Sequence, residues 1–125
     1  MTNYPVGDFL IRIKNAAMGG KKEVVFPKVK MVVEVALALK KEGFLNEVKT
    51  DKTQITATIT YYKKEPLLLD IKLISKPGLR VYMGASELSK IRKPSIILVS
   101  TPKGILSAKS AAKQQLGGEL IVEVW

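Results

Sequence analysis

The sequence predicts an α+β protein made of two small α/β subdomains. Three observations predict this class. The 125 residues, 46% of them apolar, suit one domain or two small ones. Residues 1–62 carry helical and strand patterns in the order α-β-α-β-β, whereas residues 67–125 are mostly strand patterns separated by turn residues. Between them, residues 63–66 (KKEP) have the charge and the proline of a linker.

Two amphipathic helices and three strands are predicted in the amino-terminal subdomain. The first helix spans residues 5–18, with a proline in its first turn and two glycines after its end. Its apolar stripe is Val6, Phe9, Leu10, Ile13 and Ala17. The expected core face of the second helix, residues 28–42, is Val29, Val32, Val33, Ala36 and Leu37. The strands are expected at residues 23–27, 44–48 and 54–62.

The carboxy-terminal subdomain is predicted to be β-rich with two short helical segments. One helical turn has Ser86 as its cap, and a helix over residues 108–116 has Ser107 as its cap and Gly117 at its end. The predicted strands occupy residues 67–75, 79–83, 95–100, 105–106 and 119–125.

The charge of the chain is its strongest functional signal. Twenty-one Lys and Arg residues face eleven Asp and Glu residues, which gives a net charge of +10. Both halves are basic, so a folded surface rather than a terminal arm must carry the field. Such a field indicates a polyanionic partner, most often a nucleic acid. A solvated basic surface is the plainer alternative, and an anionic membrane fits less well because the charge is not gathered in one amphipathic helix.

Composition also disfavours several other classes. The chain has no histidine and no cysteine, so it lacks the commonest acid–base residue, thiolate metal sites and disulfides. We therefore expect no enzymatic activity, no cofactor and no metal. No apolar run reaches the roughly 18 residues of a membrane span, and no signal-peptide pattern opens the chain. These features favour a cytoplasmic protein without a membrane partner.

Three turn segments carry candidate contact residues. In STPKG, Pro102 and Gly104 are explained by a tight turn, but Ser100, Thr101 and Lys103 add hydroxyls and a charge suited to RNA. In SKPGLRVY, an aromatic residue follows two cations, a combination that nucleic-acid surfaces use; these residues are Lys76, Arg80 and Tyr82. In GGEL, residues 117–120, a helix end leading into a strand is the simplest explanation. Taken separately, each segment is also compatible with an ordinary turn.

Taken together, these segments resemble a known family. SKPGLRVY, STPKGIL and LGGELIVEVW, preceded by YPVGDFLIRIKNA and LKKEGFL, resemble in order and spacing protein eight of the bacterial small ribosomal subunit. The resemblance spans essentially the whole chain. It implies the two subdomains, primary binding to the central domain of 16S ribosomal RNA early in assembly, contacts with neighbouring small-subunit proteins, and in many bacteria repression of the protein's own operon messenger RNA.

The resemblance also implies which residues contact RNA. In the carboxy-terminal subdomain they are Ser100, Thr101, Lys103, Gly104, Tyr82, Gly117, Gly118 and Glu119. In the amino-terminal subdomain the phosphate-facing positions are Arg12, Lys14, Asn15 and Lys30. The sequence departs from the family where Pro102 replaces a second serine, where Tyr4 replaces an aspartate helix cap, and where the lead-in RKPSIIL is one residue short.

A DNA-binding module remains the runner-up because it explains the charge. The two amino-terminal helices are separated by a predicted strand rather than a tight turn, so the pattern does not match a helix-turn-helix. A small enzyme explains neither the charge nor the turn segments.

Overall fold

Residues 5–59 form a helix pair packed on a three-stranded sheet. The computed structural model describes residues 4–125. The helices are α1 (Pro5–Met18) and α2 (Lys30–Lys41). The antiparallel sheet has the order β1-β3-β2, and its strands are β1 (Glu23–Pro27), β2 (Leu45–Thr50) and β3 (Gln54–Ile59). In β3 every second residue is buried, so one face of the sheet lies in the core and the other is open to solvent.

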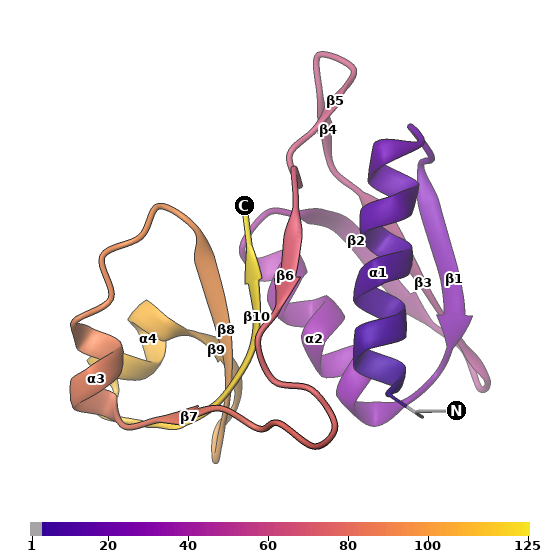
Figure 1. Cartoon of the computed structure of the whole chain (residues 1–125). Helices are drawn as coiled ribbons and strands as arrows, with labels where there is room; N and C mark the ends of the chain where they lie inside the picture. Colours follow the sequence, from indigo (N-terminus) through magenta and orange to yellow (C-terminus); the bar gives the residue numbers. More distant parts are fainter. Residues whose placement is uncertain (1–3) are drawn as a thin grey trace.

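The second half is built on a five-stranded antiparallel sheet. Its strands are β6 (Ile71–Leu73), β7 (Tyr82–Met83), β8 (Ile96–Thr101), β9 (Gly104–Ser107) and β10 (Gly118–Val124). Strand β10 is central, because it pairs with β6, β7 and β8. Two short helices, α3 (Ala85–Ser89) and α4 (Ala108–Lys113), lie together on one side of this sheet (Figure 1).

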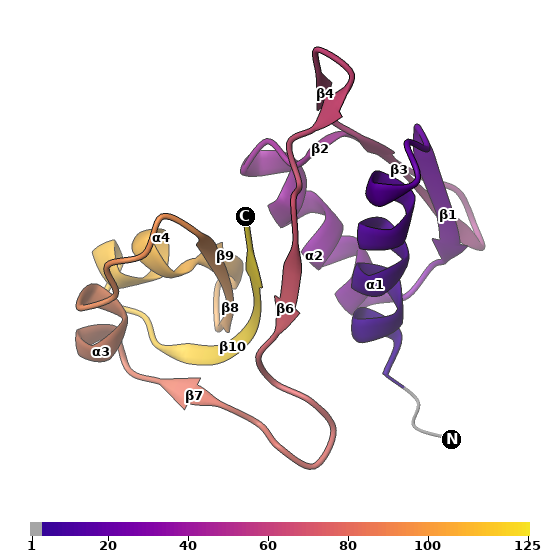
Figure 2. The same cartoon turned by 45° about the horizontal axis from the view of Figure 1, so that its top comes forward.

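A continuous hydrophobic core joins the two halves. Successive residues of β8 point to opposite faces: Leu98 packs with α1 and α2, whereas Val99 packs with α3 and α4. On the first side the core includes Phe9, Leu10 and Ile13 of α1. The five-stranded sheet therefore lies between the amino-terminal helices and the small carboxy-terminal helices (Figures 1 and 2). None of the helices described in residues 4–125 is long and apolar enough to span a bilayer.

The α+β class and the amino-terminal order α-β-α-β-β are confirmed. The chain also contains a two-stranded hairpin, β4 (Tyr61–Tyr62) and β5 (Glu65–Pro66), which includes the residues predicted as a linker. Several element ends differ from prediction. The strands expected over residues 67–75 and 79–83 shorten to three and two residues, and the helix expected over residues 108–116 ends at Lys113.

The shorter strands have specific hydrogen-bonding causes. The amides of Leu69 and Asp70 both donate to the Trp125 carbonyl, so this segment closes against the chain end instead of extending a ladder. The Val81 amide donates to the Ser75 hydroxyl rather than to a neighbouring strand. The predicted cap Ser86 is also wrong: α3 begins after Gly84, whose amide donates to the Glu87 carboxylate at 3.2 Å.

The predicted core face of α2 is partly wrong. Leu37 is 49% exposed, while Val35 and Leu39 are fully buried. The buried stripe of the helix is Val32, Val35, Ala36 and Leu39, at the i, i+3, i+4, i+7 spacing of one helical face. The helix has apolar residues on two faces, so the sequence pattern alone does not show which face is buried. Packing against α1, β2 and β9 buries the face that carries Leu39.

Replacing Leu39 by alanine should lower the free energy of unfolding by about 2–5 kcal/mol, because the deletion leaves a cavity in a closely packed core. Leu37→Ala, two residues away on the same helix, should change it by less than about 0.5 kcal/mol. Urea denaturation measures both values. Equal losses would contradict the buried stripe assigned to α2.

Candidate nucleic-acid interface

Three strands bring residues from three predicted motifs into one row. Strand β10 lies between β7 and β8, and Glu119 is directly opposite Tyr82 on one side and Ser100 on the other. Directly opposed residues of antiparallel strands project to the same face. This row, with Arg80 and the hairpin tip at residues 101–104, is called the three-strand surface. It lies at the end of the molecule where α1 begins, the lower end in Figure 1.

Charges on the three-strand surface are partly compensated. Arg80 Nη1 lies 3.2 Å from Glu119 Oε2, so the carboxylate in the row has its own counter-ion. The Tyr82 side chain is 67% exposed and has an aromatic face available for stacking. Because Glu119 is paired with Arg80, its negative charge repels the phosphate backbone of a nucleic acid less than an unpaired carboxylate would.

Tyr4 holds the segment that carries Arg80. The Tyr4 hydroxyl donates to the Ser75 carbonyl at 3.1 Å, and its ring centroid is 5.5 Å from Arg80 Cζ. Burial raises the pKa of Tyr4, so the hydroxyl keeps its proton at neutral pH. The Ser75 hydroxyl is buried and accepts from the Val81 amide at 2.9 Å. Sequence reasoning missed this contact, although Tyr4 stood out as a departure from the family's helix cap.

Thr101 closes the hairpin tip from within. Its hydroxyl donates to the Gly104 carbonyl at 2.7 Å and accepts from the Lys103 amide at 3.1 Å. A hydroxyl has one hydrogen and two lone pairs, so one lone pair remains for a ligand. Gly104 has a φ of +104°, which glycine adopts without steric cost. Lys103 is exposed at the tip, whereas Ser100 is partly buried in β8.

Gly117 and Gly118 are required by packing. A Cβ atom on Gly118 would lie 1.9 Å from the Ser100 carbonyl oxygen, and one on Gly117 would lie 2.6 Å from the Met83 carbonyl oxygen. Only a residue without a side chain lets β10 pass this close to β8 and to the end of β7. The glycine pair therefore shapes the three-strand surface through its backbone.

The amino-terminal candidates do not form one cluster with this surface. Arg12 lies over the Phe26 ring and donates to the Val25 carbonyl, so it faces β1. Lys14 Nζ is 2.8 Å from Asp70 Oδ1, which ties α1 to the segment before β6. Asn15 is exposed on α1, and Lys30 is exposed at the first residue of α2. Of the remaining candidates, Lys76 is exposed on the tight turn that links β6 to β7.

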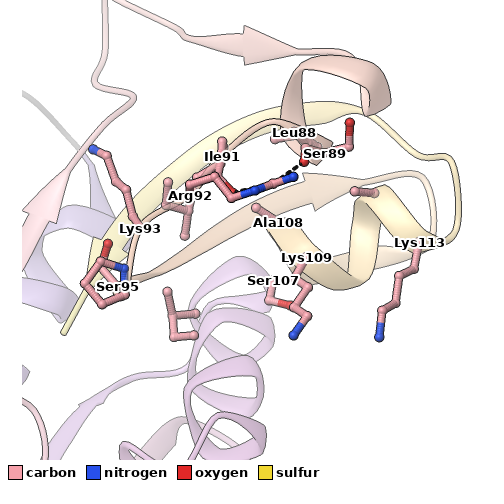
Figure 3. A pocket seen from close by; sticks show the side chains of 14 residues that line it. Leu88, Ser89, Ile91, Arg92, Lys93, Ser95, Ser107, Ala108, Lys109 and Lys113 are labelled. Carbon is pink, nitrogen blue, oxygen red and sulfur yellow. Dashed lines mark hydrogen bonds between the residues drawn. The ribbon is translucent and has the colours of Figure 1, made fainter.

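A separate groove lies on the other side of the five-stranded sheet. It encloses about 800 Å³ between α4 and the segment linking α3 to β8, with Lys109 and Lys113 on its rim (Figure 3). Arg92 is turned back onto the Ser89 carbonyl at 2.6 Å, and Lys93 pairs with Glu123 at 3.6 Å. The described residues that line the groove include no carboxylate.

Comparison with known proteins gives the family. The family model described as ribosomal protein S8 matches residues 4–125. The chain belongs to the ribosomal protein S8 family. "Small ribosomal subunit protein uS8" of Nitratidesulfovibrio vulgaris (strain DP4) is 39% identical over 126 residues, covering all of both chains. Proteins of the same name from Spiroplasma kunkelii and Pelagibacter ubique (strain HTCC1062) are 40% and 37% identical, covering 96% of both chains for the first, and 97% of this chain and 96% of the relative for the second.

Membership of this family makes the chain a structural ribosomal protein rather than an enzyme. The family assignment expected from the five sequence segments is confirmed. The partners of such a protein are, in general, ribosomal RNA and other ribosomal proteins. A basic, partly compensated surface with an exposed aromatic ring is consistent with that class of partner.

Gly118→Ala should lower the free energy of unfolding by about 1–3 kcal/mol, because β8 and β10 must separate to admit the methyl group. Gly84→Ala is the control, since the nearest atom to its added Cβ is 3.8 Å away. Denaturant unfolding of both variants provides the comparison. A Gly118→Ala protein as stable as Gly84→Ala would show that the close approach is not required.

The Lys14–Asp70 pair should contribute a pH-dependent stability. Lys14, and then the Ile71 amide, lower the pKa of Asp70 by hydrogen bonding to its carboxylate. A depressed pKa in the folded state stabilises the protein above the ordinary aspartate value of about 3.9. This contribution is lost as the pH falls through the lower folded pKa.

Asp70→Asn should therefore be less stable than the wild type at pH 7, and the difference should shrink on acidification below about pH 4. Urea unfolding over this pH range measures the difference. Asp51→Asn is a comparison outside the pair, because hydrogen bonds from the Thr53 and Gln54 amides, rather than a lysine, are the main cause of the lowered pKa of Asp51. A constant difference at every pH would argue against the pair.

Proposed function

We propose that this ribosomal protein binds the central domain of 16S ribosomal RNA through the three-strand surface and thereby aids assembly of the small subunit. The single observation that carries the proposal is the register that aligns Tyr82, Glu119 and Ser100 across three strands. Three segments distant in sequence meet in a row beside an exposed lysine at a tight hairpin tip. Turn formation alone explains each segment but not their convergence.

Each part of the surface has a distinct role in the proposed contact. Double-stranded RNA hides its base edges in a deep groove, so a protein of this kind reads unpaired bases at an internal loop. Tyr82 offers a ring for stacking, while the partly buried Ser100 hydroxyl and the exposed backbone of the tip offer hydrogen bonds. Lys103 and Lys76, both exposed, supply charge for the phosphates.

Thr101 has an indirect role in this proposal. Its hydroxyl hydrogen is already used within the turn, so it orders the tip and presents at most one lone pair to RNA. Pro102 further restricts the turn, which lowers the entropy cost of ordering the loop on binding. The positive charge of Arg80 compensates the negative charge of Glu119, so this carboxylate can lie near RNA and accept a hydrogen bond from a base amino group or a ribose hydroxyl.

The remaining candidates extend the proposed contact along the backbone of the RNA. Lys30 begins α2 near the same end of the molecule, and Arg12, Lys14 and Asn15 would meet phosphates only if the RNA continued along α1. Messenger RNA of the protein's own operon would use the same surface if it presents a similar internal loop. A DNA-binding role is disfavoured, since β1 separates α1 from α2.

Two substitutions test the division between charge and shape. Lys103→Ala should reduce the salt dependence of binding to a central-domain RNA fragment by about one unit of slope, the effect of one lost phosphate contact. Thr101→Val should weaken binding by about 1–3 kcal/mol, because the turn loses its internal bonds, and should leave the slope nearly unchanged. Gel-shift titration at several salt concentrations measures both.

Thr101→Ser is the control, because it keeps the hydroxyl and should retain most of the affinity. Duplex DNA of equal length is the competitor control. If both variants weakened the cognate RNA and an unrelated RNA equally, the three-strand surface would not read the RNA, and the proposal would fail.

A further inference from the structure

A second basic surface lies at the other end of the molecule from the three-strand surface, the upper end in Figure 1. The β4–β5 hairpin projects from the body of the molecule in both views (Figures 1 and 2). Tyr61 pairs with Pro66 and Tyr62 pairs with Glu65, so the connecting loop is the two residues Lys63 and Lys64. Sequence reasoning treated this segment as a linker.

The backbone of this loop disfavours the residues that occupy it. Lys63 and Lys64 have φ values of +52° and +68°. Two consecutive positive φ values define the tight hairpin turn that normally selects Asn-Gly, because a Cβ atom is unfavourable in this conformation. Fold stability alone therefore does not account for a Lys-Lys pair, and strain of this kind is found where function requires the side chains.

The side chains of the hairpin are arranged for an external ligand. Tyr62 is 64% exposed, and the Lys63 ammonium lies 5.4 Å from the centroid of its ring. Lys64 is also exposed. A phenol ring beside adjacent ammonium groups offers a stacking face and phosphate-binding charge within one short segment.

Two more lysines are held next to the hairpin. The Tyr61 hydroxyl donates to the Lys21 carbonyl at 2.6 Å, and the Ile59 amide donates to the Lys22 carbonyl at 2.8 Å. Both lysine side chains are exposed on the turn between α1 and β1. Glu23 follows Lys22 in the chain and Glu65 is paired with Tyr62, so this region carries four lysines and two glutamates. This set, Tyr62, Lys63, Lys64, Lys21 and Lys22, is called the lysine hairpin.

We propose that the lysine hairpin is a second RNA contact, which stacks an unpaired base on Tyr62 and holds adjacent phosphates with its lysines. The inference rests on the proposed RNA-binding function but uses a different surface. Helix α1, 14 residues and thus about 20 Å long, runs from Tyr4, which lies beside Arg80, to the turn that carries Lys21. One RNA could therefore be held at two places, which would orient the whole protein on it.

RNA is favoured over an acidic protein segment by the spacing of the groups. Each nucleotide offers a phosphate and a base together, and the turn places an ammonium and a ring side by side. The tight turn also holds both lysines next to each other, where they can bind successive phosphates of one flexible RNA strand. An acidic protein partner is retained as an outcome of the test.

The double substitution Lys63→Asn and Lys64→Gly separates folding from binding. Asn-Gly suits the turn, so the midpoint of urea unfolding should be unchanged or higher. The salt-dependence slope for oligouridylate of about 12 nucleotides should fall by about 1.4, since each phosphate contact contributes about 0.7 for single strands. Tyr62→Ala should weaken this binding about tenfold, whereas Tyr62→Phe should retain it.

Lys109→Gln with Lys113→Gln is the charge-matched control, because these exposed lysines lie on α4, on the side of the five-stranded sheet away from the amino-terminal half, and should leave the slope nearly unchanged. Wild-type slope and affinity in the hairpin variant, or an equal loss in the control, would overturn the proposal. A photo-crosslinking residue at position 62 in reconstituted small subunits should label RNA. Labelling of protein alone would overturn it in favour of a protein partner.

The two proposals can fail separately. If the wild-type protein bound central-domain RNA and duplex DNA equally well, the proposed function would be refuted, and the oligouridylate result would still stand. If the wild type preferred central-domain RNA over duplex DNA, but the hairpin variant bound oligouridylate with unchanged slope and affinity, only the second contact would be refuted. When both surfaces bind, the effects of Lys103→Ala and of the hairpin variant on affinity should add, because the sites are too far apart to couple directly.

Discussion

The close approach of β10 to β8 at Gly118 is the constraint on which the rest of the three-strand surface depends. A side chain there would occupy the space of the Ser100 carbonyl, so the strands could not pair in the observed register. That register aligns Tyr82, Glu119 and Ser100. The same central strand carries core residues for both halves of the molecule, so a shift of β10 would disturb the fold and the surface together.

Net charge describes the protein as a whole but does not locate its ligands. Several cations have partners within the protein: Arg80 with Glu119, Lys14 with Asp70, and Lys93 with Glu123. Arg80 and Lys14 were predicted to meet RNA, and each also stabilises a junction of the fold. The exposed cations of the two proposed surfaces, such as Lys103 and Lys63, are better placed to neutralise phosphates. The proposed interface is thus two separate, limited surfaces of one molecule, and each can be altered without the other.

Much of the fold was predictable because local patterns and final structure agree. The first helix and the first strand have the predicted ends, and Ser107 caps α4 by accepting from the Ser110 amide, as expected. Prediction failed where apolar residues were plentiful on two faces, as in α2, or where tertiary hydrogen bonds replaced a ladder, as at Val81. Among the candidate contacts, Lys76, Thr101, Lys103 and Gly104 lie at tight turns, as their segments predicted. The segments did not reveal that the Thr101 hydroxyl bonds within the turn, or that the close packing of two strands requires Gly118.

The sequence by itself determined the class of the protein: its charge, its lack of histidine and cysteine, its helix and strand patterns and the family its segments resemble. These are properties of composition and of neighbours along the chain, which a linear pattern contains in full. Only the tertiary structure decided which of these residues meet. The pairing of β10 with both β7 and β8, and the contact between Tyr4 and the segment before Arg80, join residues about 20 to 75 positions apart. Such contacts depend on packing in three dimensions, and no local periodicity encodes them.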